Sequence, residues 1–264
     1  MHRPALHQRP TANDPIWLFA GTADGPPLAA ALLAVGWRVH VRLVSRAATR
    51  SYAPHPRLQL EVGALASDQL LVEEMERLQP RWVVDATHPF AQEIRQRLQR
   101  TCQSRCQPLL RLDRREPEEA SAGEQLLWLD NVAELIQVPL QDKRLLLAIG
   151  ARQLAAARQA SEGSSHFARV LDQPASLQAA LAAGLAEDRI ACLRPDPSGK
   201  GDLEAALCRR WRISHVLCRQ GGGRSEALWR RVCRELNLPL LLLRRPHEPS
   251  GLSPEKLLEN LGKP

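Results

Sequence analysis

The feature that most constrains the fold of this chain is a regular alternation of short apolar runs with segments of helical spacing. In the first half the apolar runs have strand length, and turn residues separate them from the helical segments. The expected strands are 16–19, 39–44, 58–62, a run beginning at Trp82, and 108–112, and the expected helices are 28–35, 67–78 and 90–104. Alternation of this kind predicts a parallel, doubly wound α/β sheet.

The alternation resumes in the second half of the chain, from Leu145 onward. The expected strands are 145–149, 167–171, 190–193, 216–218 and 240–243, and the expected helices are 175–185, 203–211 and 225–236. A chain of 264 residues fits two modest domains. We therefore expect two Rossmann-like doubly wound domains with parallel sheets, over 15–140 and 141–264, behind a flexible N-terminal extension, 1–14.

The charge of the chain indicates an anionic partner. Its net charge is +7 and its isoelectric point is about 9.5. Aromatic residues make up only 4%, so there are few platforms on which single-stranded nucleic acid could stack, and no nucleic-acid-binding motif is recognisable. A small anionic molecule is therefore a better candidate than nucleic acid.

Other features bear on the compartment and on metals. No apolar run approaches the roughly 20 residues that span a membrane, and the first fourteen residues do not form a secretion signal. Six scattered cysteines suggest a reducing compartment, so we expect a cytoplasmic protein. Cys102 and Cys106 would share one face of a helix, and we interpret them as packing residues rather than metal ligands.

A glycine-bearing turn follows the first expected strand. Residues Gly21, Thr22, Ala23 and Asp24 lead into a helix that begins near two prolines. Such a turn at a helix N-terminus can hold a phosphate, which makes these four residues candidates for cofactor binding. The spacing is not the full dinucleotide fingerprint, and a plain tight turn explains it nearly as well.

The end of the second strand bears on the choice of cofactor. An NAD-selective domain carries an acid at this position, whereas this strand ends in Ser45 and Arg46, with Arg50 close behind. A cation here favours the 2′-phosphate of NADPH. The alternative, that both arginines are ordinary surface residues, is equally compatible with the sequence.

The loop after the fourth strand carries Asp85, Thr87, His88 and Pro89 ahead of a helix. In open α/β sheets, ligands bind at the carboxyl ends of the strands. Helix capping would explain Asp85, Thr87 and Pro89, but it leaves His88 without a role. We therefore favour a functional loop, in which His88 has a pKa suited to proton transfer.

Three segments together resemble the precorrin-6A reductase and cobalt-precorrin-6A reductase family of cobalamin biosynthesis. They are the glycine turn at 20–25, the V-D-A-T-H-P-F-A block at 84–91, and the C-terminal segments 238–240 and 244–246. The resemblance runs from about Ile16 to Pro246. It departs from the family pattern at 218–223, which lacks a serine, and at 194–197.

The resemblance implies a two-domain α/β oxidoreductase that reduces one double bond of a carboxylate-fringed tetrapyrrole, giving precorrin-6B, with NADPH or NADH. His88 and Asp85 would be catalytic, with Asp85 orienting His88 or holding the loop. The cofactor would contact the glycine turn, Ser45, Arg46 and Thr87, and other enzymes of the corrin pathway are candidate partners. The macrocycle would lie in an interdomain cleft, and its candidate contacts are Pro89, Arg152, Arg219, Gln220, Gly221 and Gly222.

Two rival functions remain open on the sequence. One is a non-catalytic NADPH-binding regulator, which would keep the glycine turn but would not need a titratable group beside the nicotinamide. The other is an NADPH reductase of another small anionic substrate, such as a nucleotide-linked sugar. Such enzymes usually carry a Tyr-x-x-x-Lys pair, which this chain lacks.

Overall fold

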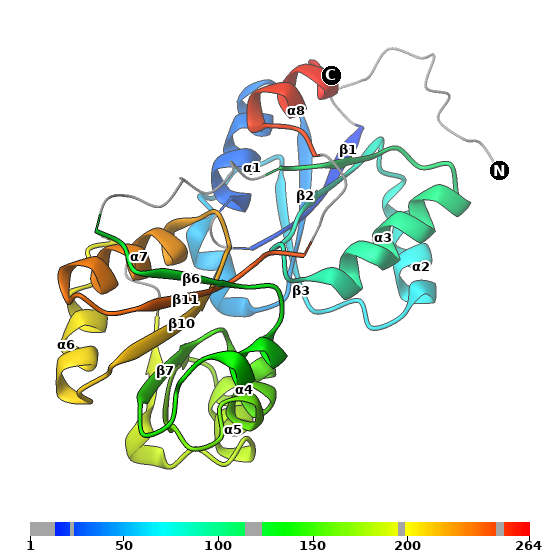
Figure 1. The fold of residues 1–264 in the computed structure, drawn as a ribbon. Coiled ribbons are helices and arrows are strands. Elements are labelled where there is room, and N and C mark those ends of the chain that lie inside the picture. Colours follow the sequence, from blue (N-terminus) through cyan, green and yellow to red (C-terminus); the bar gives the residue numbers. More distant parts are fainter. Residues whose placement is uncertain (1–13, 22–23, 114–122, 195–198, 247–250) are drawn as a thin grey trace. The chain divides into compact units, whose positions relative to one another are not determined.

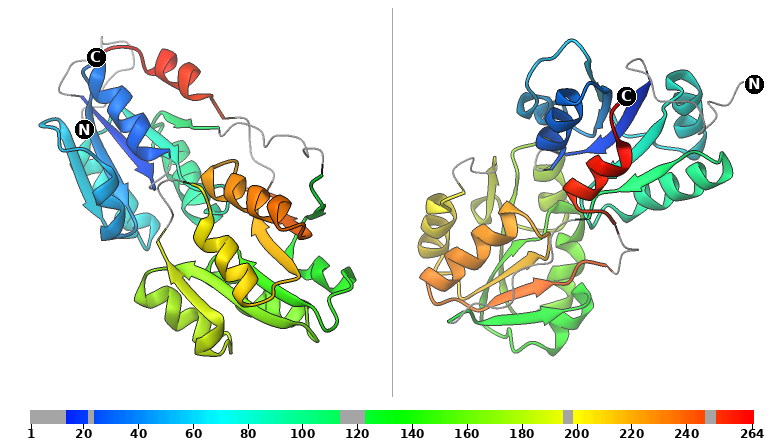
Figure 2. Two further views of the ribbon diagram at one scale, coloured as in Figure 1. Left: turned by 90° about the vertical axis from the view of Figure 1, so that its left-hand side faces the viewer. Right: turned by 90° about the horizontal axis from the view of Figure 1, so that it is seen from above.

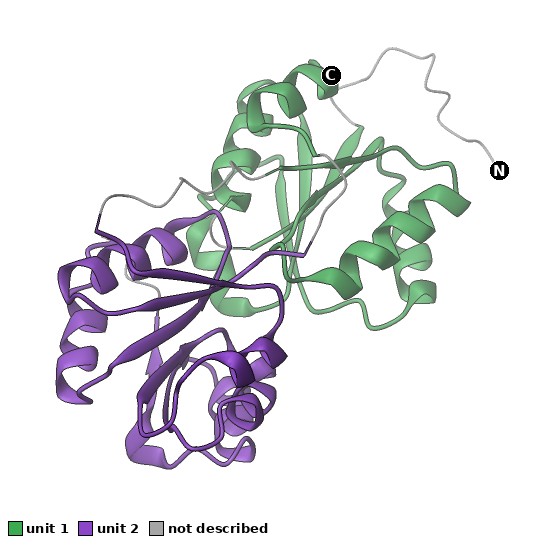
Figure 3. Cartoon of the chain, in the orientation of Figure 1, with its two compact units in different colours: residues 1–115, 247–264 green, residues 116–246 purple. Residues whose placement is uncertain are grey.

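The computed structural model describes residues 14–21, 24–113, 123–194, 199–246 and 251–264 (Figure 1). The chain divides into two compact units (Figure 3). Unit 1 comprises Met1–Arg115 and His247–Pro264, and unit 2 comprises Glu116–Pro246. The extension predicted over 1–14 falls almost wholly outside the described residues.

Unit 1 is built on a five-stranded parallel sheet of order β3-β2-β1-β4-β5. The strands are β1 (Pro15–Ala20), β2 (Arg38–Leu43), β3 (Leu58–Val62), β4 (Trp82–Ala86) and β5 (Leu109–Arg111). The chain runs outward from β1 to β3 and then returns to add β4 and β5 on the other side of β1. This reversal places a topological switch point between β1 and β4.

Helices cover both faces of this sheet, so its strands are buried on both sides (Figures 1 and 2). Helices α1 (Gly25–Ala34) and α8 (Pro254–Leu261) pack against one face with Ile16 and Leu18 of β1. Helices α2 (Asp68–Leu78) and α3 (Gln92–Ser104) pack against the other face with Trp17 and Phe19. The alternation along β1 therefore divides the core of unit 1 into two layers.

The C-terminal segment returns to unit 1, although the sequence placed it in the second domain. Leu252 forms a parallel bridge with Leu112 just beyond β5, and the indole N–H of Trp37 donates to the Gly262 carbonyl at 2.9 Å. Leu257 and Leu261 of α8 are buried in the core of unit 1. The predicted second domain, 141–264, therefore extends too far, because the amphipathic face of α8 packs against unit 1.

Unit 2 holds a six-stranded parallel sheet of order β6-β11-β10-β7-β8-β9. Its strands are β6 (Leu126–Leu129), β7 (Arg144–Ala148), β8 (Ser165–Leu171), β9 (Ile190–Leu193), β10 (His215–Arg219) and β11 (Leu240–Leu243). Its α-helices are α4 (Leu154–Ala160), α5 (Pro174–Ala182), α6 (Asp202–Arg210) and α7 (Arg224–Glu235). Here the order reverses between β7 and β10, which makes a second switch point.

The boundary between the units lies earlier than the sequence suggested. Strand β6 pairs with β11, Leu126 opposite Leu240, so residues before 140 already belong to the second sheet. The division therefore falls at Arg115 and Glu116 instead of near 140. The sequence did not predict β6, because this short strand follows a charged stretch and no helix was expected between it and β5.

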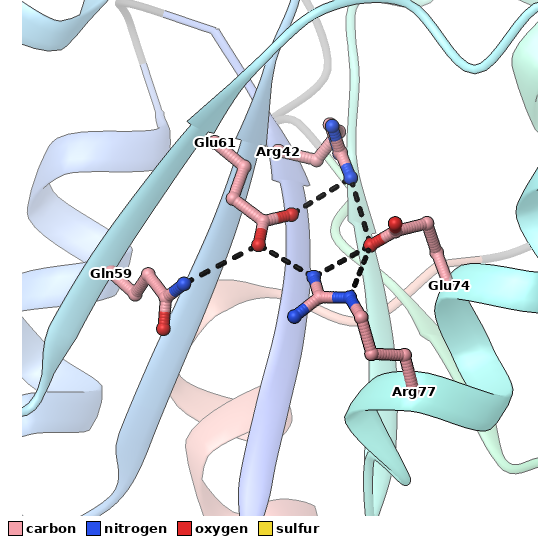
Figure 4. Close-up of polar contacts among 5 residues, drawn as sticks. All are labelled: Arg42, Gln59, Glu61, Glu74 and Arg77. Atoms are coloured by element: carbon pink, nitrogen blue, oxygen red, sulfur yellow. Dashed lines mark hydrogen bonds and ion pairs between the residues drawn. The ribbon is translucent and has the colours of Figure 1, made fainter.

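An ion-pair network ties α2 to the edge of the first sheet (Figure 4). Arg42 of β2 contacts Glu61 of β3 at 2.7 Å and Glu74 of α2 at 3.2 Å. Arg77 of α2 contacts the same two carboxylates, each at 2.6 Å. Arg77 is half exposed, so its pairs are screened, whereas Arg42 is largely buried and firmly held. Within the described ranges, every helix is too short or too polar to cross a membrane.

Candidate active site

The switch point of unit 1 brings two of the predicted loops together. In the register of the sheet, Phe19 of β1 lies opposite Asp85 of β4, and Ala20 lies opposite Ala86. Gly21 and Thr87 therefore leave neighbouring strands at the same level. This edge is where open α/β sheets bind ligands.

Asp85 is the anchor of the β4 loop. It is only 3% exposed, and both carboxylate oxygens accept hydrogen bonds. Oδ1 accepts from the Thr87 N–H at 2.9 Å and the Thr87 hydroxyl at 2.6 Å, and Oδ2 accepts from Arg111 of β5 at 3.0 Å. A buried carboxylate without partners would be costly, so these contacts fix the loop. Of the two roles predicted for Asp85, the contacts correspond to holding the loop.

The rest of the loop presents His88 to solvent. Its Nδ1 accepts a hydrogen bond from the Phe90 N–H at 3.2 Å, so a neutral ring carries its proton on Nε2. Pro89 is buried, and its carbonyl accepts from the buried guanidinium of Arg95 at 2.8 Å. The loop is thus held on both sides of an exposed imidazole.

Asp85 does cap the turn, since its Oδ1 accepts from the Thr87 N–H, but the interpretation of Thr87 as a helix cap and of Pro89 as a first-turn residue is wrong. Helix α3 begins at Gln92, its N-cap is Ala91, and no side chain caps it. Thr87 donates its hydroxyl to Asp85, and Pro89 precedes the helix altogether.

Tyr52 contacts the glycine turn that leads into α1. It directly follows the 3₁₀ helix η1 (Arg46–Ser51). The Tyr52 hydroxyl donates to the Gly21 carbonyl at 2.9 Å. A Cβ at Gly25 would overlap this hydroxyl and approach the Ala20 Cβ to 2.6 Å, so only glycine fits there. A Cβ at Gly21 would meet nothing within 4 Å.

The predicted contacts around Gly21 are only partly described. Thr22 and Ala23 lie outside the described residues, and Asp24 is the N-cap of α1 without a side-chain cap bond. Pro26 and Pro27 have no N–H, and the Leu28 N–H donates to the Asp24 carbonyl at 3.2 Å, so of the first four residues of α1 only Gly25 could offer its N–H to an anion.

The end of β2 carries one exposed cation beside this turn. Ser45 is the N-cap of η1, and Arg46 is exposed and makes no ion pair within the described part of the chain. Arg42, four residues earlier, is held by two carboxylates (Figure 4). Arg46 is thus better placed than Arg42 to meet a phosphate.

The switch point of unit 2 gathers the other predicted residues. Cys218 of β10 lies opposite Ala148 of β7, so Arg219 and the Gly150 turn follow at the same edge. Gly150 has φ +79°, and a Cβ there would lie 3.3 Å from Arg219 Nη1. Burial, with the nearby charge of Arg152, lowers the pKa of Arg219 to about 10, so it stays protonated at neutral pH.

The glycine loop after β10 is internally braced. The side-chain oxygen of Gln220 accepts from the Arg245 N–H at 2.9 Å, which ties the loop to the end of β11. The Gly222 N–H donates to Glu226 at 2.9 Å, and Glu226, 4% exposed, also accepts from Arg230. Gln220 thus has a structural role beside any contact with a ligand.

Cys102 and Cys106 are the pair of cysteines that the sequence analysis considered as possible metal ligands. Cys102 is buried in α3, but Cys106 is exposed beyond the helix end with φ +49°, so the predicted shared face is wrong. Among the described residues, no group of three or more His, Cys, Asp or Glu side chains could hold a metal ion.

Sequence reasoning missed the partners that hold the site. Arg111, Arg95, Gln153 and Glu226 make their contacts across the fold or within helices whose starts were uncertain. Only Arg111 carried a usable indication, because it ends a strand that the sequence did predict beside β4.

Comparisons with known proteins bear on the family and the fold of the chain. The family model for precorrin-6x reductase CbiJ/CobK matches residues 15–262. A cobalt-precorrin-6A reductase of Synechocystis sp. is 31% identical over 241 residues, covering 89% of this chain and 90% of the relative. A precorrin-6A reductase of Rhodobacter capsulatus is 27% identical over 236 residues, covering 88% of each chain.

A solved structure, CobK precorrin-6A reductase, shares the fold. It is 23% identical, covers 94% of this chain and 96% of its own, and has a TM-score of 0.75. The match to the family model over nearly the whole chain, with the same two-unit fold, settles the classification. This chain belongs to the precorrin-6x reductase family, whose members are nicotinamide-dependent oxidoreductases of cobalamin biosynthesis.

Proposed function

We propose that this chain reduces one double bond of precorrin-6A, or of its cobalt form, to give the precorrin-6B ring. The observation that carries the proposal is the register of β1 and β4, which sets the glycine turn and the Thr87–His88 loop side by side. One loop suits a cofactor phosphate, and the other offers a titratable group. Membership of the family, together with relatives named for both forms of the substrate, supports the same conclusion.

Unit 1 would bind the nicotinamide cofactor. The positive end of the α1 dipole, together with the Gly25 N–H, suits the pyrophosphate, and the open space over Gly21 lets it approach the backbone. Arg46, with no acid at the end of β2, favours NADPH over NADH. Ser45 and Thr87 would line the same edge. The bound cofactor supplies the hydride.

Saturating a double bond also requires a proton, and His88 is positioned to supply it. The Phe90 N–H donates to Nδ1, so a neutral ring carries its proton on Nε2, and the ring is exposed. After hydride reaches one carbon, His88 would protonate its neighbour and regain a proton from solvent. Asp85 and Thr87 would keep the loop in place and are not themselves proton donors in this scheme.

Unit 2 would bind carboxylates of the tetrapyrrole. Arg219 and Arg152 share one edge, and two neighbouring positive charges are most stable when an anion lies between them. Gly221, Gly222 and Pro89 stay predicted contacts of the macrocycle, although the Gly222 N–H already donates to Glu226 and Pro89 is buried. The interdomain cleft expected from the size of the macrocycle stays a prediction.

The proposed role of His88 is tested by replacing it with alanine and with glutamine. Both variants should bind NADPH normally, because the proposed phosphate contacts lie on the glycine turn and Arg46, and kcat should fall roughly 100-fold, the lower end for general acid catalysis. A His88→Ala enzyme with unchanged kcat and an unchanged pH profile would show that water delivers the proton.

A further inference from the structure

The single tyrosine of the chain, Tyr52, connects the two loops that would bind the cofactor. Its hydroxyl donates to the carbonyl of Gly21 at 2.9 Å, and the residue is only 7% exposed. Burial, with the nearby charge of Asp24, raises the pKa of Tyr52, so the hydroxyl stays protonated well above neutral pH. The Gly21 carbonyl therefore keeps this donor throughout the neutral range.

The same hydroxyl also lies against the other end of the glycine turn. A Cβ at Gly25 would overlap the Tyr52 hydroxyl and lie 3.1 Å from the ring carbon Cζ. Tyr52 thus packs against both residues that bound the turn, Gly21 and Gly25. A peptide group is planar, so a held carbonyl at Gly21 fixes the orientation of the backbone where the turn begins.

Two further hydrogen bonds lead from Tyr52 to Arg46. The Tyr52 N–H donates to the Thr49 carbonyl at 3.1 Å, and the Thr49 hydroxyl donates to the Arg46 carbonyl at 2.8 Å. Each bond spans three residues, one turn of the 3₁₀ helix η1. The backbone of Arg46 is therefore tied, through η1 and Tyr52, to the backbone of Gly21.

The two loops would contact different phosphates of one ligand. NADPH carries a pyrophosphate and a 2′-phosphate, whereas NADH carries only the pyrophosphate. A ligand held at two points binds most tightly when those points already have the right separation, because fewer groups must be ordered on binding. A fixed separation between the glycine turn and Arg46 therefore favours NADPH in particular.

We propose that Tyr52 is a positioning residue that sets the separation between the glycine turn and Arg46, and so supports the selection of NADPH over NADH. The proposal rests on the proposed function, because it takes these two loops as the contacts of the pyrophosphate and the 2′-phosphate. Replacing Tyr52 with phenylalanine keeps the aromatic ring but removes the donor. The glycine turn then loses its hydrogen bond to the segment that follows η1.

The experiment compares Tyr52→Phe with a matched control, Ser104→Ala. The control also removes a hydroxyl that donates to a backbone carbonyl, that of Thr101 at 3.0 Å, but at the C-terminal end of α3. Calorimetric titration measures the dissociation constants of NADPH and NADH. Tyr52→Phe should weaken NADPH roughly tenfold and NADH roughly threefold, magnitudes expected for the loss of one hydrogen bond. Ser104→Ala should change both by less than about twofold.

The effect of Arg46→Ala in the Tyr52→Phe background separates positioning from packing. This substitution should weaken NADPH only about threefold there, against roughly tenfold in the wild type, because the guanidinium no longer has a fixed place relative to the turn. A tyrosine that only packs would leave the effect of Arg46→Ala undiminished. That result, or equal losses of NADPH and NADH in Tyr52→Phe, would overturn the proposal.

A second variant, Thr49→Val, tests the same connection without altering Tyr52. It removes the hydroxyl bonded to the Arg46 carbonyl and keeps the shape of the side chain. The preference for NADPH should fall, by a smaller factor than in Tyr52→Phe. If Tyr52→Phe does not fold, an unchanged preference in Thr49→Val would overturn the proposal.

Failure of this inference is distinguishable from failure of the proposed function. If the wild-type enzyme oxidises NADPH with precorrin-6A and Tyr52→Phe keeps the wild-type preference between the cofactors, only the role of Tyr52 is refuted. If the wild-type enzyme reduces no tetrapyrrole, the proposed function itself falls. The dissociation constants need no turnover, and the thermal midpoint of each variant reports whether it is folded.

Discussion

The buried carboxylate of Asp85 offers the sharpest test of how the β4 loop is held. In Asp85→Asn, one oxygen can still accept from Thr87, but the new NH₂ group faces the donors of Arg111. Two unit charges 4 Å apart attract by about 4 kcal/mol at an effective dielectric constant of 20, before the cost of desolvation. Breaking one partner of a buried pair typically costs about 3–5 kcal/mol.

We expect Asp85→Asn to lower the free energy of unfolding of unit 1 by about 2–4 kcal/mol, below the full range because the Arg111 side chain is 13% exposed. Urea unfolding, read by amide hydrogen exchange in β4 and β5, measures the loss. The double variant Asp85→Asn, Arg111→Met should be less destabilised than the sum of the single variants, because the new amide NH₂ group no longer faces a guanidinium. A loss below about 1 kcal/mol for Asp85→Asn, or strict additivity, would refute the assignment of this pair as the anchor of the loop.

Three further predictions concern the cofactor site and the stability of the two units. Arg46→Ala should weaken the binding of NADPH roughly tenfold or more and leave the binding of NADH nearly unchanged, whereas the control Arg50→Ala should weaken NADPH binding less. Calorimetric titration with both cofactors measures these affinities. Equal losses for NADPH and NADH would show that Arg46 does not contact the 2′-phosphate. Gly25→Ala should destabilise unit 1 and weaken cofactor binding, because its Cβ would overlap the Tyr52 hydroxyl; an unchanged thermal midpoint would contradict the packing described. Burial lowers the pKa of His166 to about 4 from 6.5, so the folded state resists protonation. The contribution of His166 to the free energy of unfolding should be nearly complete above pH 6.5. The free energy of unfolding should fall by about 2 kcal/mol between pH 7 and pH 5. In urea unfolding, His166→Gln should remove most of this dependence on pH.

The sequence was sufficient for the elements whose periodicity spans several residues. The predicted strands lie within a few residues of β1 to β5, and Ser67, the first residue of the predicted second helix, is the N-cap of α2. Strand β6 and helix α8 were missed, because β6 follows a charged stretch with no predicted helix beside it and α8 follows a proline-rich stretch late in the chain. The packing of α8 on unit 1 is a long-range property that no local pattern encodes.

The same distinction between local patterns and long-range contacts holds for the candidate site. The loops at the carboxyl ends of β1 and β4, and of β7 and β10, could be placed from sequence, because within each parallel sheet those ends lie at the same edge. The residues that bind the side chains of these loops could not be predicted from the sequence. Arg111 meets Asp85 across 26 residues, and Arg219 meets Gln153 across 66, and only the assembled sheets bring them together.

The loop after β4 shows how a reasonable local interpretation fails. Thr87 and Pro89 have the residue types of a helix start, yet α3 begins three residues after Pro89. Tertiary contacts decide the outcome, since Asp85 holds the Thr87 hydroxyl and Arg95 holds the Pro89 carbonyl.

The measurement that tests the central claim most directly is an anaerobic assay that follows nicotinamide absorbance with precorrin-6A and cobalt-precorrin-6A in parallel. The account predicts that NADPH is oxidised only when one of these macrocycles is present, with one cofactor consumed for each ring and two hydrogens gained by the product. The ring that reacts faster identifies the preferred substrate. Tight binding of NADPH without oxidation by either macrocycle would contradict the account, and would leave a cofactor-binding protein without this reductase activity.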